Sequence, residues 1–408
     1  MGDKLREIGI EPVREEFAVS PRASICGIPY AGWLGLALSA LVYIEMGIPA
    51  VWYGMALASA ACIVWLVCSV FLYKTWFDMF FKQEISQNTY GELLPEDGKY
   101  DYTIILSGHM DTVFPEGKAS TCPFFIDEEG YAHGPGVLDM KGGLVVSLYA
   151  VKALSALSLV TPPIKFVFVT DEETLHMHSN AKAVLRREIT GAKAFLNFEP
   201  CAENGQVVLS RYGGGPVSIH VHGCAAHSGT SPEKGRSAIL EAAHKIIYLE
   251  SKNDISRGKL INCGAIDGGI GENTIPGECT LRIGVRYRTE SLAQEIKENL
   301  KEATASQTVP DTWADLDLTH LIPAMDLKEG GKGLIVKLQE AAAFYSMSPI
   351  KGIQVGGLSD AGLAASLGIP TLCGMGVIGS GAHTDEEKAL VSSLFERSVL
   401  AAALLHLL

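Results

Sequence analysis

Most of the chain shows apolar and polar positions in the order typical of a protein that alternates strands and helices. Short runs rich in β-branched and aromatic residues predict strands at 102–106, 164–169 and 194–198. Between them, apolar residues at helical spacing predict helices at 143–154 and 180–187. This alternation predicts a globular α/β domain.

A second pattern begins near Val207 and ends near Asp317. Strands and helices are predicted there at 216–221, 237–249, 279–287 and 291–305. A βαββαβ lid inserted into the larger α/β domain explains this order. The expected domains are a catalytic α/β domain of 1–23, 74–208 and 320–408, a lid or dimerisation domain of 209–319, and an N-terminal hairpin of 24–73.

The hairpin is expected from two long apolar segments. Residues 23–44 and 46–73 contain no charged residue, and a helix that spans a bilayer needs about 20 apolar residues. Aromatic residues gather near the ends of both segments, as they do at membrane interfaces. We therefore predict a transmembrane helical hairpin at 24–73. The alternatives are a buried hairpin in a soluble core and a hydrophobic dimer surface.

The charges beside the hairpin predict its orientation. Basic residues precede and follow it but are missing from its connecting loop; they are Lys4, Arg6, Arg14, Arg22, Lys74 and Lys82. The positive-inside rule then places both ends in the cytoplasm. We expect a membrane protein whose catalytic domain lies on the cytoplasmic side of the lipid bilayer.

Composition narrows the classes of function. The formal net charge is −13 and the pI is about 5.4, so we expect neither a basic surface for phosphates nor a nucleic-acid partner. The nine cysteines include no CxxC pair, which fits a reducing compartment. A metal ion in this protein is therefore expected to have nitrogen and oxygen ligands.

Residues that can bind metals stand where predicted strands end. His109 and Asp111 are two positions apart in "SGHMDTV", so on a strand they face the same side. Asp139 lies between glycine-rich turns in "HGPGVLDMKGG". Taken singly, these are equally a strand-end histidine, a loop aspartate and a turn aspartate with no ligand role.

Further acids and a histidine complete the set. Residues 171–173, "DEE", end a β-rich strand, and stacked carboxylates repel one another unless a cation or proton relieves them; an acid-rich first turn of a helix is the alternative. Glu199 ends another strand, and His383 lies in a glycine-rich loop. Two imidazoles and three carboxylates suit two divalent ions that share one carboxylate, with Zn²⁺ favoured and Co²⁺ or Mn²⁺ as alternatives. Glu172 is left to act as a base on a bridging water.

Seven motifs in order resemble the M20 family of metallopeptidases and aminoacylases, and most of all its glutamate carboxypeptidase branch. They are "SGHMDTV", "GPGVLDMKGG", "TDEE", "FEP", "AAHSG", "GENTIPGECTLRIGVRY" and "GAHTDEE". The resemblance covers roughly Ser86 to the C-terminus. It implies a di-zinc amidohydrolase whose catalytic domain carries a smaller inserted lid through which two chains form a homodimer.

The resemblance also implies how the ligands are shared. Asp139 would bridge two Zn²⁺ ions. His109 and Glu199 would complete one site, and Glu173 and His383 the other.

Other residues take roles from the same resemblance. Asp111 would support the first histidine, and Glu172 would be the general base. His227 of "AAHSG" would reach the partner subunit's site and stabilise the developing oxyanion. Asn273 and Arg286 would hold the substrate carboxylate. The alternatives for the last three are an exposed turn histidine, a turn asparagine and a strand arginine paired with an acid.

The expected function is hydrolysis of an amide bond next to a free carboxylate, in a small peptide or an N-acyl amino acid, by a metal-bound water and a glutamate base. A carboxypeptidase or dipeptidase is expected first. One alternative is an N-acyl-amino-acid deacylase of the same family. The other is a non-catalytic, membrane-tethered peptide-binding protein.

Two stretches depart from the family pattern. Residues 3–17 resemble only the end of the usual N-terminal helix and strand, and 86–93 resembles their resumption, so the hairpin interrupts the catalytic domain and the start of the chain is expected to be truncated. After "DEE", the chain reads "TLHMHSNA" in place of a Gly/Ser-rich turn. We expect His176 and His178 to be exposed loop residues, with adventitious metal ligands as the alternative.

Overall fold

The computed structural model describes residues 1–19, 84–93, 103–159, 161–177, 179–201, 205–326 and 329–408. The chain divides into two compact units, Met1–Arg14 with Asn88–Leu408, and Glu15–Gln87. The predicted membrane hairpin at 24–73 lies outside the described residues. In the part of the chain that is described, no helix has the length and apolar character needed to cross a bilayer.

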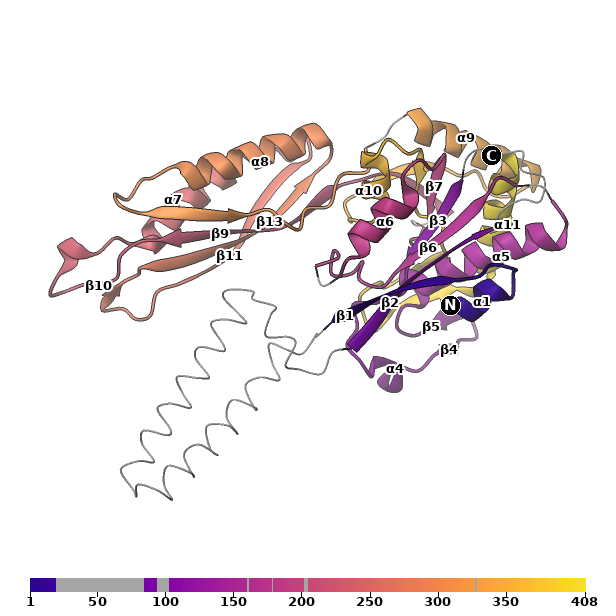
Figure 1. Cartoon of the computed structure of the whole chain (residues 1–408), viewed down its shortest axis with the longest axis horizontal. Coiled ribbons are helices and arrows are strands. Elements are labelled where there is room, and N and C mark those ends of the chain that lie inside the picture. The colour runs from indigo at the N-terminus through magenta and orange to yellow at the C-terminus, as the bar shows by residue number, and fades with distance from the viewer. Residues whose placement is uncertain (20–83, 94–102, 160, 178, 202–204, 327–328) are drawn as a thin grey trace, which may run out of the picture. The chain divides into compact units, whose positions relative to one another are not determined.

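A six-stranded sheet in the order β1-β2-β6-β3-β7-β16 forms the larger body (Figure 1). Its strands are β1 (Val13–Val19), β2 (Glu84–Leu93), β3 (Ile104–His109), β6 (Ile164–Val169), β7 (Ala194–Asn197) and β16 (Thr371–Leu372). Strands β6, β3 and β7 are neighbours and run parallel, whereas β2 is antiparallel to β6. Strand β16 is also parallel to β7. The carboxyl ends of β6, β3 and β7 therefore meet at one edge, and the predicted strands in this region are confirmed.

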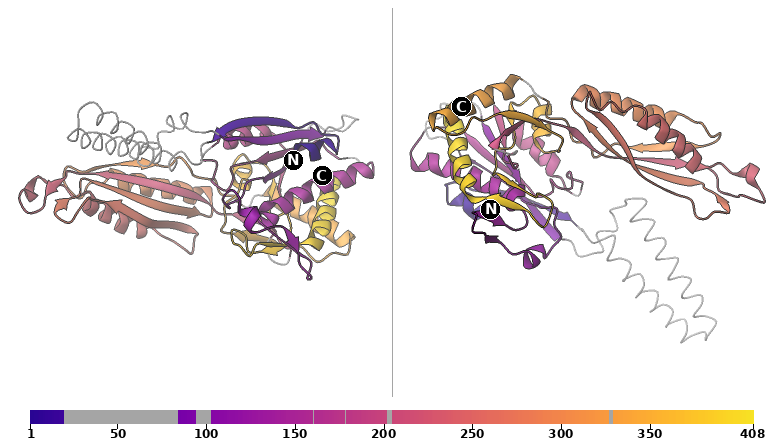
Figure 2. Two further views of the ribbon diagram at one scale, coloured as in Figure 1. Left: turned by 90° about the horizontal axis from the view of Figure 1, so that it is seen from below. Right: turned by 180° about the vertical axis from the view of Figure 1, so that it is seen from behind.

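Helices cover both faces of this sheet (Figure 2). One face carries α5 (Gly142–Ala156), α9 (Glu329–Phe344) and α11 (Val391–Leu407), and the other carries α6 (Ala181–Ile189) and α10 (Ala361–Ser366). The side chains of β3 alternate between the two faces of the sheet. Because helices cover both faces, β3 is buried on both sides. Ile104 and Leu106 join the core under α5, and Ile105 joins the core under α6. The predicted α/β class is confirmed.

Shorter elements complete the part of the larger body that the structure describes. They are α1 (Gly2–Arg6), α4 (Lys118–Thr121), β4 (Phe125–Ile126), β5 (Tyr131–His133), the π-helical turn η3 (Val137–Lys141), β8 (Val207–Arg211), β15 (Gly352–Val355), β17 (Gly379–Ser380) and β18 (Lys388–Leu390). Strand β8 pairs with β15. A small sheet in the order β17-β18-β5-β4 joins the segment after β3 to the hairpin that carries His383.

The lid follows the predicted βαββαβ order. Its elements are β9 (Gly213–His222), α7 (Ala238–Glu250), β11 (Lys259–Gly268), β13 (Glu278–Tyr287), α8 (Glu290–Ala305) and β14 (Trp313–Asp317), with β10 (Ala226–His227), η5 (Pro232–Lys234) and β12 (Thr274–Ile275) in the loops. The four long strands form an antiparallel sheet, and α7 and α8 share its core. Ser237 and Thr289 cap these helices by accepting hydrogen bonds from the main chain. A separate lid sheet is confirmed, and the exact domain boundaries stay a prediction.

Residues 20–83 separate two strands that are neighbours in the sheet. Strand β1 ends before this stretch, β2 begins after it, and the two form the edge of the larger sheet. The interruption expected from the sequence therefore falls between two adjacent strands and leaves the parallel strands continuous.

Candidate active site

The predicted ligands come together where the parallel strands end. His109 is the last residue of β3, and Glu199 follows β7 by two positions. Glu172 and Glu173 follow β6, which lies beside β3. Asp139 comes from the turn η3, just before α5. Polar side chains at the carboxyl ends of neighbouring parallel strands are the usual way in which an open α/β sheet builds a site.

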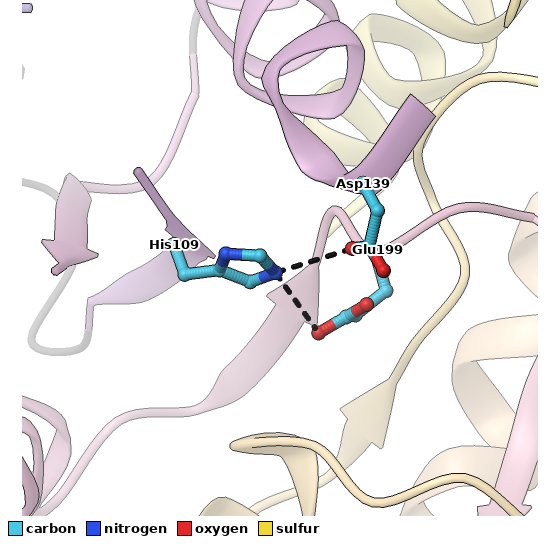
Figure 3. A group of neighbouring side chains, drawn as sticks. All are labelled: His109, Asp139 and Glu199. Carbon is cyan, nitrogen blue, oxygen red and sulfur yellow. Dashed lines mark hydrogen bonds and ion pairs between the residues drawn. The ribbon is translucent and has the colours of Figure 1, made fainter. Parts of the chain in front are cut away.

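The first cluster is formed by His109, Asp139 and Glu199 (Figure 3). His109 Nε2 lies 3.2 Å from Asp139 Oδ1 and 4.0 Å from Glu199 Oε1. The imidazole is 2% exposed, and Glu199 is also buried. Two ligand atoms of a tetrahedral zinc ion lie about 3.4 Å apart, so these separations suit one shared ion.

The second cluster is formed by Asp139, Glu173 and His383. His383 Nε2 lies 3.1 Å from Asp139 Oδ2 and 3.3 Å from Glu173 Oε2. The two oxygens of Asp139 thus face different histidines, with Oδ1 toward His109 and Oδ2 toward His383. A carboxylate placed in this way could be shared by two ions, one on each side.

The electrostatics of the site also fit divalent cations. Burial, helped by the charge of Asp139, raises the pKa of Glu199 to about 7. Burial likewise raises the pKa of Glu173, whose Oε1 is buried with no hydrogen-bond partner among the described residues. Cations held in the two clusters would relieve both the repulsion and the missing contact. Oxygen and imidazole donors suit Zn²⁺, Co²⁺ and Mn²⁺.

Asp111 supports both clusters. His109 Nδ1 donates to the carbonyl oxygen of Asp111 at 3.1 Å, and its carboxylate Oδ1 is 3.5 Å away. The other carboxylate oxygen accepts a hydrogen bond from the main-chain N–H of Glu173 at 3.0 Å. Asp111 therefore orients His109 by accepting from its imidazole ring, and Glu173 by accepting from its main-chain N–H.

Glu172 has the environment of a general base. It is 9% exposed. Burial raises the pKa of its carboxyl well above the usual range, and the charges of Glu199 and Asp360 add to the effect. A carboxyl whose pKa is raised can hold and release a proton nearer to neutral pH.

Among the described residues, the three predicted lid residues form no hydrogen bond or ion pair with these clusters. His227 is exposed, and its Nδ1 accepts hydrogen bonds from the N–H groups of Gly229 and Thr230. Asn273 lies close by, since its carbonyl oxygen accepts a hydrogen bond from Ser228.

Arg286 lies apart from acidic partners. It is half-buried on β13, and its guanidinium donates to the carbonyl oxygen of Val285. Burial lowers its pKa. Within the described residues it forms no ion pair, so the alternative of a strand arginine paired with an acid is not observed.

The prediction for His176 was wrong. Its side chain is buried, and Nε2 lies 2.6 Å from Asp360 Oδ1. Both it and Leu175 have left-handed backbone, with φ of 58° and 56°. A partner distant in sequence offsets the cost of burying the imidazole. His178 lies outside the described residues.

Two residues of the site were missed. Arg211 is buried, with its guanidinium 4.0 Å from Glu199 Oε2 and hydrogen-bonded to the carbonyl oxygens of Gly357 and Leu358. Glu387 is buried and accepts three main-chain hydrogen bonds from the segment around Asp139. In the sequence, Glu387 is the last acid of "GAHTDEE", four positions after His383. Nothing in the sequence distinguished it from the acids beside it.

A cavity of about 280 Å³ lies beside the second cluster. Its walls come from the segment after β3 and from the residues after His383; they include Phe114, Lys118, Phe125, His133, Thr384 and Asp385. The rings of Phe125 and His133 stack at 4.6 Å, and Lys118 pairs with Asp385 at 2.6 Å. The cavity therefore combines flat apolar walls with a polar rim.

Comparison with known proteins agrees with this geometry. Residues 105–406 match the peptidase family M20/M25/M40. Carboxypeptidase G2 of Pseudomonas sp. (strain RS-16) is 30% identical over 327 residues, which are 79% of this chain and 77% of that protein. Aminopeptidase PepT from Bacillus cereus ATCC 10987 has a TM-score of 0.63 at 25% identity, covering 78% of this chain and 84% of its own. The Bacillus subtilis YXEP protein, a dinuclear metal-binding peptidase, shares the fold with a TM-score of 0.57 at 16% identity, over 78% and 84% of the two chains.

Proposed function

Because this chain belongs to the peptidase family M20/M25/M40, we propose that it is a two-metal hydrolase that cleaves an amide bond next to a free carboxylate. A carboxypeptidase or dipeptidase is the proposed type. The observation that carries the proposal is the placement of Asp139, whose two oxygens face His109 and His383 separately. A structural aspartate has no need of two imidazole partners on opposite oxygens.

The protein's residues divide the chemistry among them. Metal ions held by the two clusters, Zn²⁺ first and Co²⁺ or Mn²⁺ as alternatives, would lower the pKa of water and polarise the scissile carbonyl. Glu172 accepts the proton of the attacking water and then donates it to the departing amine. The raised pKa of its carboxyl makes the ionised form a stronger base for the first step. Asp111 keeps His109 in the required tautomer by accepting the hydrogen of Nδ1.

The free carboxylate of the substrate is assigned to Arg286 and Asn273. The guanidinium of Arg286 is half-buried without an acidic partner among the described residues, which leaves its charge available for bidentate recognition. We assign the acyl side of the substrate to the cavity beside His383. An N-acyl-amino-acid deacylase would use the same residues with another acyl group.

The first experiment tests the base. The Glu172→Gln variant keeps the shape of the side chain but cannot accept the proton, so kcat should fall about 10²- to 10⁴-fold. Its content of Zn²⁺ after dialysis should match that of the unaltered protein. A Glu172→Gln enzyme that binds two ions and keeps full activity would rule out the mechanism.

A substrate panel tests the specificity. Dipeptides, N-acylglutamates and N-acetyl amino acids should be compared with matched compounds whose α-carboxylate is converted to an amide. We expect the amides to be poor substrates, and Arg286→Leu should raise KM for the free acids at least tenfold without changing KM for the amides. Equal rates on acids and amides would contradict the assignment of Arg286. Preference for N-acetyl amino acids over dipeptides would favour the deacylase.

The lid is proposed to join two chains into a homodimer in which His227 reaches the partner subunit's site. Subunit complementation tests this. Glu172→Gln and His227→Ala chains should each be nearly inactive. An equal mixture of the two should regain about a quarter of full activity, because half of its dimers are heterodimers and each heterodimer has one intact site of two. Mixing without recovery would contradict sharing of the site between subunits.

The membrane location remains a proposal that the charge-free segments 23–44 and 46–73 support. The full chain should sediment with membranes, resist alkaline carbonate and be released by detergent. In sealed vesicles, protease on the cytoplasmic side should digest the hydrolase domain, and protease on the opposite side should leave it intact. A full chain that is soluble without detergent would overturn the proposal.

A further inference from the structure

Glu387 connects two parts of the site that are far apart in sequence. It follows His383 by four positions and immediately precedes β18, yet its side chain is directed at the turn that carries Asp139. One carboxylate oxygen, Oε1, accepts hydrogen bonds from the N–H groups of Leu138 and Asp139, each at 2.9 Å. The other, Oε2, accepts one from the N–H of Gly136 at 2.9 Å.

These hydrogen bonds are strong because Glu387 is buried and its carboxylate is charged. Glu387 is 3% exposed, and hydrogen bonds to an ionised carboxylate are roughly twice as strong as neutral ones. Because the turn η3 is short, its first N–H groups have few main-chain acceptors, and Glu387 supplies them. Removing the carboxylate would leave three buried or half-buried donors without their partner.

The loop that carries His383 needs such an anchor. Its imidazole is 54% exposed, and its backbone has a left-handed φ of 65°. The nearby pair between Lys118 and Asp385 involves an Asp385 side chain that is 71% exposed, and pairs of this kind contribute little. Glu387 is the buried contact that ties this loop to the turn of Asp139.

We propose that Glu387 is a positioning residue for the second metal site, which keeps His383 and Asp139 within reach of one ion. This inference rests on the proposed two-metal function. Both carboxylate oxygens of Glu387 accept hydrogen bonds from main-chain N–H groups, so Glu387 acts through the backbone N–H of Asp139 and through the short loop that follows His383. Its loss should therefore weaken the site shared by Asp139, Glu173 and His383 more than the site of His109 and Glu199.

The experiment measures zinc binding rather than activity alone. Full-length Glu387→Gln and Glu387→Ala chains are dialysed against Zn²⁺ buffered over a range of free concentrations, and bound zinc is counted by elemental analysis. The first ion should bind as it does to the unaltered protein, and the second at least tenfold more weakly, the scale expected for a residue that orients ligands. Glu387→Gln should be milder, because its remaining carbonyl oxygen can still accept from Leu138 and Asp139.

Glu386→Gln is the matched control, since Glu386 is the adjacent acid and is exposed. It should bind two ions with unchanged affinity. Added Zn²⁺ should restore hydrolysis by Glu387→Gln, which a merely misfolded chain would not allow. Two ions bound normally by Glu387→Ala, or equal weakening of both ions, would overturn the inference.

The two proposals can fail separately. If the unaltered protein binds two ions but hydrolyses none of the substrates, the proposed function falls, and the zinc counts of the Glu387 variants still decide the role of Glu387. If the unaltered protein binds fewer than two ions, both proposals are overturned.

Discussion

Removal of the metal ions should make the stability of this protein fall as the pH rises from about 4.5 to about 7. Burial, with the charge of Asp139, raises the pKa of Glu199 from its usual 4.5 to about 7 in the metal-free fold. Between these two values the unfolded chain loses the Glu199 proton while the folded chain keeps it. The folded state then binds more protons than the unfolded state, so the free energy of unfolding decreases with pH.

The magnitude follows from the same shift. One pKa unit corresponds to about 1.4 kcal/mol, so Glu199 alone should lower the free energy of unfolding by about 3 kcal/mol above pH 7. Glu172 acts in the same direction, because burial raises its pKa as well. Asp111 and Asp139 have lowered pKa values, for which burial is outweighed by contact with His109. Their contribution is lost only below their usual value of 3.8, outside this window.

Urea unfolding of chelated and zinc-loaded protein at pH 5, 6, 7 and 8 measures the effect. The chelated protein should be less stable at pH 8 than at pH 5 by at least about 3 kcal/mol, whereas bound Zn²⁺ should remove the decline because it stabilises the ionised carboxylates. Chelated Glu199→Gln should show a smaller decline. A chelated protein that is equally stable at pH 5 and pH 8, or a Glu199→Gln variant with an unchanged slope, would refute the reasoning.

Two further predictions concern packing around the site. A Cβ added at Gly143 would lie 1.8 Å from the carbonyl oxygen of Phe198, so Gly143→Ala should destabilise by about 3 kcal/mol or more and reduce zinc content. Gly333→Ala on helix α9 is the control, because nothing lies within 4 Å of the added Cβ. It should raise the free energy of unfolding by up to about 1 kcal/mol. Thermal unfolding compares the two variants. His176→Asn should cost about 3 kcal/mol by leaving Asp360 buried without its partner, and adding Asp360→Asn should recover part of it; full additivity of the two would contradict a direct interaction.

The clustering of the candidate ligands could be predicted from the sequence because these residues stand at the ends of predicted strands. His109 and Glu199 each follow a short β-rich run, and such runs become neighbouring parallel strands whose carboxyl ends converge. Asp139 was recognisable from its glycine-rich surroundings, although the turn that holds it, η3, was not. The lid elements were predictable for a similar reason, since alternating and helical spacings were both clear.

Contacts across long sequence distances could not be predicted in the same way. His176 read as an exposed loop residue because its partner, Asp360, is 184 positions away. Glu387 stands beside two similar acids, and only its distance to the N–H groups of the Asp139 turn sets it apart. Local patterns specify which residues end a strand, but not which distant polar group satisfies a buried one.

The crowding of carboxylates that weakens the metal-free fold is also what prepares it for cations. Burial is the leading cause of the raised pKa of Glu172, and the charge of Glu199 is the second. A cation held by Glu199 would cancel the second cause and leave the first, so the pKa of Glu172 should be lower in the metal-loaded protein than in the metal-free one. Binding of the adjacent ion would then widen the pH range in which the Glu172 carboxylate is ionised and able to accept a proton. Metal binding, stability and the readiness of the base are thus coupled through one carboxylate, Glu199, and a change there should alter all three together.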